Sequence, residues 1–97
     1  MRRNIFTFRK RAFLQPLSTG ANSHIVAEVE SSDYGEYKHG HNMLTIADCN
    51  RVIHFEFFLG TARERKLSLR KINLLISVLT AFRDALAKEI AAIETPR

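Results

Sequence analysis

The chain has 97 residues, a formal net charge of +5 and 45% hydrophobic residues. This length suffices for one hydrophobic core, so we predict a single domain over residues 1–97. The single cysteine, Cys49, excludes an intrachain disulfide. No unbroken apolar signal segment follows the N-terminus, and polar residues interrupt the longest apolar region, Ile72 to Ile93. We therefore expect no secretion signal, no membrane span and a cytoplasmic location.

Charge is distributed unevenly along the chain. Residues 1–20 carry a net charge of +5, residues 21–60 carry −4, residues 61–71 carry +4, and the remainder is neutral. Two basic blocks therefore flank an acidic stretch. Such blocks attract phosphate without specificity, but they also serve as solvated surface that keeps a protein soluble. Composition by itself favours the second interpretation.

The first third of the chain alternates between apolar and polar residues, as β-strands do. We predict strands near 5–14 and 24–30. The first places Phe6 and Phe8 on one side and the arginines on the other, and we expect both phenylalanines in the core. Residues 31–42 are polar and contain glycines, which predicts a long loop and a candidate functional segment.

A β-hairpin is predicted in the middle of the chain. Strands near 43–47 and 52–59 flank Asp48-Cys49-Asn50-Arg51, in which the Asp and Asn tolerate turn conformations. The second strand places four large apolar side chains on one face: Ile53, Phe55, Phe57 and Leu59. We expect this face to be core and to be covered by a helix.

The last third has the periodicity of a long helix. Apolar residues recur at three- and four-residue steps: Ile72, Leu75, Leu79, Phe82, Leu86, Ile90 and Ile93. Thr61 and Glu64 have the spacing of a capping box, whereas Ser68 precedes the point at which the periodicity becomes dense. We favour Ser68 and predict a helix over about 68–94, ended by Pro96. The predicted class is α+β, a four-stranded antiparallel sheet packed against one long C-terminal helix.

The apolar side of this helix is wide. A second apolar row lies beside the first: Leu74, Val78, Ala81, Ala85 and Ala92. Together the two rows cover roughly half of the circumference, which is more than one sheet face requires. We therefore expect a homodimer through the C-terminal helix, around a two-fold axis. The alternative is a monomer whose N-terminal strand covers the helix.

No group of residues predicts catalysis, a cofactor or a metal. His39 and His41 share a loop, but no third ligand is evident. Cys49 and His54 lack a recognisable orienting partner, and the glycines are too dispersed for a nucleotide-binding loop. Glu28 and Glu30 have the pattern of a solvated acidic edge. We expect a protein that is not an enzyme and has no cofactor and no metal.

Basic residues interleave with phenylalanines near the N-terminus and recur before the helix. Proteins that hold single-stranded nucleic acid combine cations for phosphates with aromatic faces for bases. Our hypothesis is a small dimeric protein that binds nucleic acid weakly and without sequence specificity. Its phosphate contacts are expected from seven side chains: Arg9, Lys10, Arg11, Arg63, Arg65, Lys66 and Arg70. The alternative is a protein-interaction or small-ligand-binding module with no nucleic-acid role.

The segment Lys66-Leu67-Ser68-Leu69 leads into the helix, after strand, strand and hairpin. This order of elements resembles that of the dimeric single-strand-binding coactivators of the positive-cofactor type and, more distantly, that of the Whirly proteins. The resemblance concerns the plan of the fold. No residue of this chain matches a base-stacking position of those families, so none is assigned that role, and a shared fold does not imply a shared function.

Overall fold

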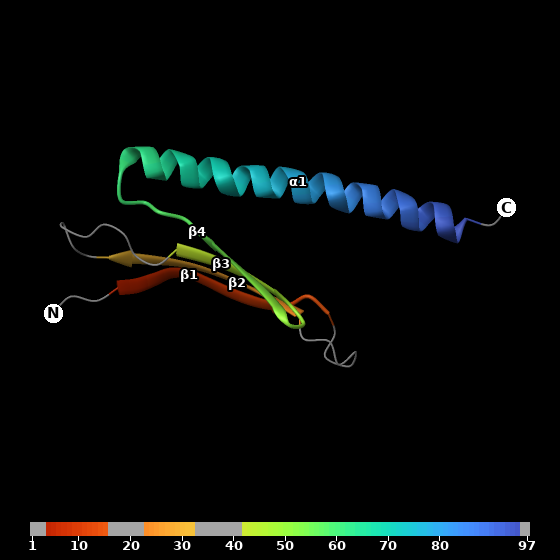
Figure 1. Cartoon of the computed structure of the whole chain (residues 1–97), viewed down its shortest axis with the longest axis horizontal. Coiled ribbons are helices and arrows are strands. Elements are labelled where there is room, and N and C mark those ends of the chain that lie inside the picture. Colours follow the sequence, from red (N-terminus) through yellow and green to blue (C-terminus); the bar gives the residue numbers. More distant parts are fainter. Residues whose placement is uncertain (1–3, 16–22, 33–41, 96–97) are drawn as a thin grey trace. The chain divides into compact units, whose positions relative to one another are not determined.

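The computed structural model describes residues 4–15, 23–32 and 42–95. It contains four strands and one helix (Figure 1): β1 (Asn4–Phe13), β2 (Ser23–Ser32), β3 (Asn42–Asp48), β4 (Arg51–Glu56) and α1 (Ala62–Glu94). The chain divides into two compact units, Met1–Arg65 and Lys66–Arg97. The predicted α+β class, with a four-stranded antiparallel sheet and a long C-terminal helix, is confirmed. The single domain and the packing of the helix on the sheet stay predictions.

The four strands form an antiparallel meander in the order β1-β2-β3-β4. In the register, Phe8 lies opposite Val29, and Ile46 lies opposite Ile53. Directly opposed residues share a face of the sheet. One face, the apolar face, therefore carries Phe8, Lys10, Ala12, Ile25, Ala27, Val29, Leu44, Ile46, Ile53 and Phe55. The other, the mixed face, includes Arg9, Arg11, Phe13, His24, Val26, Glu28, Glu30, Met43, Thr45, Ala47, Val52, His54 and Glu56.

A β-bulge interrupts β1 at Thr7. Phe6 pairs with Glu30 and Phe8 pairs with Val29, so Thr7 is the extra residue. The Thr7 hydroxyl donates to the carbonyl oxygen of Val29 at 3.3 Å. The two phenylalanines oppose neighbouring residues of β2, so the regular alternation from which their shared side was predicted is interrupted at Thr7, and that prediction does not follow. Phe8 is also 50% exposed rather than buried.

The fourth strand is shorter than predicted. β4 ends at Glu56, not at residue 59, although the Phe57 N–H still donates to the Asn42 carbonyl at 2.9 Å. Since β3 begins at Asn42, it has no residue opposite Phe58 or Leu59. Ile53 is 56% exposed. Its burial is expected from a helix packed on this face, so its place in the core stays a prediction, like that packing.

The helix begins earlier than the favoured start at Ser68. The Glu64 N–H donates to the Thr61 hydroxyl at 3.1 Å, and the Thr61 N–H donates to a carboxylate oxygen of Glu64 at 3.0 Å. This capping box satisfies N–H groups at the helix start, so α1 starts at Ala62 and Ser68 is buried within it. The end at Glu94 agrees with the prediction.

Burial is shallow in the part of the chain that the structure describes. There, the one buried hydrophobic residue is Ala47, with 2% of its surface exposed. A hydrogen bond joins the start of β2 to the end of β3: the hydroxyl of the buried Ser23 donates to an Asp48 carboxylate oxygen at 2.7 Å. No helix among the described residues has the length and apolar character needed to cross a membrane. Among the described residues, large apolar side chains of both the sheet and the helix are exposed, such as Phe8, Val52 and Phe82.

Candidate nucleic-acid interface

The three candidate cations of β1 do not share a face of the sheet. Arg9 and Arg11 belong to the mixed face, where they pair with Glu28 and Val26. Lys10 pairs with Ala27 and so belongs to the apolar face. Successive residues of a strand point to opposite sides, which separates Lys10 from its two neighbours. The three residues therefore cannot form one phosphate-binding row.

The mixed face is not strongly basic. The Arg9 Nε atom lies 3.3 Å from a carboxylate oxygen of Glu28, whose side chain is only 16% exposed. Glu30 and Glu56 also belong to this face, whereas Arg11 is its second arginine among the described residues. Carboxylates beside the arginines lower the positive potential that a phosphate would meet. This acidic neighbourhood makes Arg9 a poor candidate for phosphate binding.

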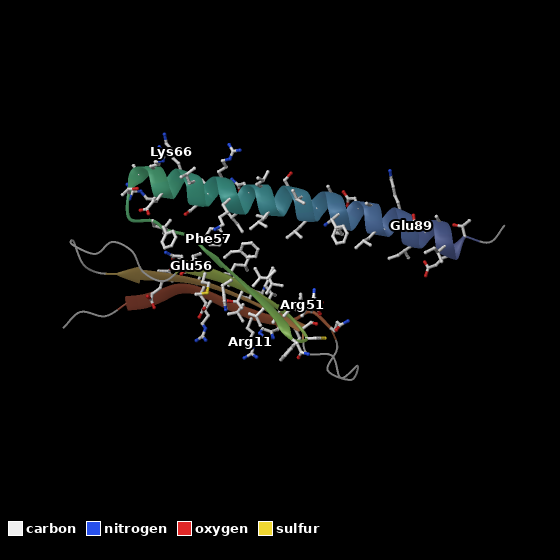
Figure 2. All side chains as sticks on the ribbon, in the orientation of Figure 1. Arg11, Arg51, Glu56, Phe57, Lys66 and Glu89 are labelled. Carbon is white, nitrogen blue, oxygen red and sulfur yellow. The ribbon has the colours of Figure 1, made fainter. Side chains whose placement is uncertain are left out.

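Arg11 and Phe13 form a different kind of feature on the mixed face. The guanidinium carbon of Arg11 lies 5.5 Å from the centre of the Phe13 ring, and Phe13 is half exposed. Figure 2 shows Arg11 extending from its strand. A cation over an exposed ring resembles the pairs on which unpaired bases stack. At this pair, the basic and aromatic groups expected on β1 meet.

The candidate cations of α1 do come together. Arg63, Lys66 and Arg70 follow one another at three- and four-residue steps, so they lie along one side of the helix, here called the basic side. All three are exposed, and Lys66 is marked in Figure 2. Nine positions separate Arg63 from Ile72, which is about two and a half helical turns. The basic side is thus opposite the apolar stripe, defined as Ile72, Leu75, Leu79, Phe82, Leu86, Ile90 and Ile93.

Arg65 has a structural contact instead. A guanidinium nitrogen of Arg65 donates to the carbonyl oxygen of Leu59 at 3.0 Å. At about 100° per residue, Arg65 also points well away from the basic side. Its hydrogen bond fixes the segment that enters α1, so the candidate interface on the helix consists of three cations and not four.

The apolar stripe is largely exposed beyond its first two residues. The exposed fraction is 53% for Leu79, 59% for Phe82 and 75% for Ile93. Sequence periodicity identified these residues, but it does not report whether anything covers them. Large apolar side chains aligned along one side of a helix indicate that this side packs against another surface, within the chain or in a partner.

The other candidate groups do not form a site in the described structure. His39 and His41 lie outside the described residues. Among the residues that are described, no three His, Cys, Asp or Glu side chains are grouped so that they could hold a metal ion. Cys49 is exposed at the β3–β4 turn, and the Nδ1 atom of His54 lies 3.0 Å from the Thr45 hydroxyl.

No known family model, curated protein or solved structure matches this chain. Its function is therefore argued from its own residues.

Proposed function

We propose that the protein is a homodimer that binds single-stranded nucleic acid weakly and without sequence preference, and that it is not an enzyme. The observation that carries the proposal is the basic side of α1. Its cations, Arg63, Lys66 and Arg70, are exposed on the side opposite the apolar stripe. A partner that covers the stripe leaves these cations in water, where they can meet phosphates.

The spacing of the basic side suits a charged backbone. Side chains three and four positions apart on a helix have Cβ atoms about 5–6 Å apart. Each lysine or arginine can therefore neutralise one phosphate and release its counterions, which gives affinity without reading the bases. Arg11 and Phe13 supply a second, aromatic element of the kind that stacks on unpaired bases.

The homodimer is supported by the exposure of the apolar stripe. Apolar surface contributes about 25 cal/mol for each Å² removed from water, so covering the stripe favours association. A second copy of the chain supplies a stripe of the same length and character, as homodimers with closed symmetry require. We also place the protein in the cytoplasm, where the exposed thiol of Cys49 stays reduced.

The test is the fluorescence anisotropy of a labelled single-stranded oligonucleotide of mixed sequence, titrated with protein at several salt concentrations. Affinity is expected to fall steeply between about 50 and 200 mM salt. A triple variant, Arg63→Ala, Lys66→Ala and Arg70→Ala, is expected to lose at least about tenfold in affinity at 50 mM salt. Its plot of log affinity against log salt should be shallower by about 2, since each phosphate contact contributes about 0.7.

The matched control removes three positive charges elsewhere, with Lys10→Ala, Arg51→Ala and Arg83→Ala. This control should keep most of the affinity, because Lys10 and Arg51 belong to the sheet and Arg83 lies on another side of α1. Equal losses of affinity in the two triple variants would show that binding depends on the net charge of the protein and not on the basic side. Binding that does not change with salt would contradict the phosphate contacts altogether.

The exposed stripe also favours a second candidate function, a protein-interaction module with no nucleic-acid role. In this case, the oligonucleotide anisotropy stays unchanged at low salt while the stripe still engages another protein. The same titration therefore separates the two functions.

A further inference from the structure

The length of α1 constrains what can cover its apolar stripe. With 33 residues, α1 is about 50 Å long, whereas the longest strands have 10 residues and span about 33 Å. The stripe is still exposed at its far end, where Ile93 is 75% exposed. A second α1 is an occupant of the right length, and it presents the same apolar residues.

The stripe contains the spacing used by paired helices. Ile72, Leu79, Leu86 and Ile93 recur every seven residues, and apolar residues follow the first two after three positions. This seven-residue repeat is typical of two helices that pack along their lengths. In an antiparallel pair, the residues that recur every seven positions in one copy face the residues three positions after them in the other copy. Leu79 then lies opposite Phe82 of the second copy, and the centre of symmetry falls between residues 80 and 81.

Charges beside the stripe select this orientation. Glu89 follows Leu86 by three positions, so it lies at the end of the interface, opposite Ile72 of the second copy. Lys71 and Glu89 are 18 positions apart, which is about five full turns, so both lie on the same side of the centre of the stripe. The two-fold axis passes between residues 80 and 81, so residue 71 of one copy lies level with residue 90 of the second copy. Each Lys71 is thus brought beside Glu89 of the second copy, twice per dimer. A parallel pair would instead set Lys71 level with Lys71 and Glu89 level with Glu89.

We propose that α1 pairs with α1 of a second copy in the antiparallel orientation, with Leu79 against Phe82 and Lys71 against Glu89. This inference rests on the homodimer in the proposed function and specifies its interface. The two basic sides then face outward near opposite ends of the paired helices. A single strand of nucleic acid would meet two separate cationic rows rather than one.

The test is sedimentation equilibrium of the full chain and its charge-reversal variants. Lys71→Glu and Glu89→Lys should each weaken the dimer about tenfold, because each creates two like-charge contacts. The double variant Lys71→Glu/Glu89→Lys should return to within about threefold of the original affinity, since the pairs are restored with their signs exchanged. Within one chain the two residues are about 27 Å apart, so an intrachain contact cannot explain that recovery.

Lys88→Glu is the matched control, because it makes the same charge change on the opposite side of α1 and should leave dimerisation unchanged. Single variants that weaken the dimer without recovery in the double variant would overturn the antiparallel register and leave the homodimer standing. A monomer at all concentrations would overturn both the register and the homodimer. Nucleic-acid binding is measured separately by anisotropy and can survive either result.

A second readout gives the orientation directly. Two single-cysteine chains, Ile72→Cys and Glu89→Cys, are made in a Cys49→Ser background and oxidised alone and mixed. The antiparallel pair predicts a disulfide only in the mixture, because residue 72 lies opposite residue 89 of the second copy. Disulfides in each variant alone, and none between the two, would establish a parallel pair and overturn the inference.

Discussion

The sheet and the helix of this protein both have a regular apolar pattern, but they differ in whether a neighbouring element is seen beside it. Every strand of the sheet has a neighbour in the same chain, and the register sets apolar residues against apolar residues, such as Ile46 against Ile53. The helix has an equally regular apolar pattern, but Leu79, Phe82 and Ile93 are more than half exposed. A repeating pattern therefore specifies which side of an element needs a partner without specifying where the partner comes from.

The same contrast holds for the cations. Arg9 of the sheet has Glu28 as its neighbour across the strands, and an ion pair forms between them. The three cations of the basic side project from one helix, away from its apolar stripe. Exposed cations grouped on one side of a helix are thus better placed to meet a phosphate than cations in a sheet that already contains carboxylates.

The largest expected effect comes from a charge placed in the centre of the stripe. Leu79→Asp puts a carboxylate against Phe82 of the second copy, where it loses its water without gaining a partner. We expect the dimer to weaken at least about a hundredfold, or about 2.8 kcal/mol. Sedimentation measures the change, with Thr80→Asp, away from the stripe, as the control. Equal dimerisation of Leu79→Asp and the unmodified chain would place the interface elsewhere.

A smaller effect, on oligonucleotide affinity, is expected from the difference between the cations of the helix and those of the sheet. Arg70→Ala is expected to lower oligonucleotide affinity about three- to tenfold at 50 mM salt and to reduce the salt slope by about 0.7. Arg9→Ala should change affinity less than about twofold, because Glu28 already neutralises that guanidinium. The anisotropy titration checks both variants. If Arg9→Ala loses more than Arg70→Ala, the phosphates contact the sheet and not the helix.

The start of the helix gives a third test, on stability. Thr61→Ala removes the hydroxyl that accepts the Glu64 N–H, and such losses cost about 1 kcal/mol. For a domain of this size we expect the midpoint of thermal unfolding to fall by about 4–8 °C at fixed protein concentration. The control is Ser77→Ala, at an exposed interior position of α1, where alanine is the better helix former and stability should not fall. A loss at Ser77 as large as the loss at Thr61 would contradict a specific role of the capping box.

The smallest expected effect is at the β3–β4 turn. Cys49 has a φ angle of 57°, in the left-handed region that costs a non-glycine residue about 1–2 kcal/mol. Cys49→Gly relieves that strain but frees the unfolded chain, so a net gain of about 0.5 kcal/mol is expected. Urea unfolding measures the gain, and a clear loss of stability would show that the thiol contributes contacts that outweigh the strain.

Local patterns predicted most of the fold. Alternation located the four strands to within a few residues, and three- and four-residue steps identified the helix and its apolar side. The errors arose where two segments had to be compared. The length of β4 depends on where β3 begins, and the interrupted alternation between Phe6 and Phe8 depends on a bulge at Thr7. Neither is visible within one segment.

The candidate interface was predicted in part for the same reason. Arg63, Lys66 and Arg70 share a side because helical spacing is local, so the sequence suffices to group them. The ion pair of Arg9 with Glu28 requires the register of β1 on β2, which spacing within β1 does not contain. The two histidines of the polar loop, at positions 39 and 41, lie outside the described residues, and their role stays a prediction.

Both proposals for α1 depend on a second copy of the chain covering its apolar stripe. The most direct test is the mass of the unmodified protein in solution, measured by sedimentation equilibrium from nanomolar to micromolar concentrations. We expect a mass of twice the 11.1 kDa of one chain at the higher concentrations, falling toward the mass of one chain on dilution. A mass of 11.1 kDa throughout would contradict it.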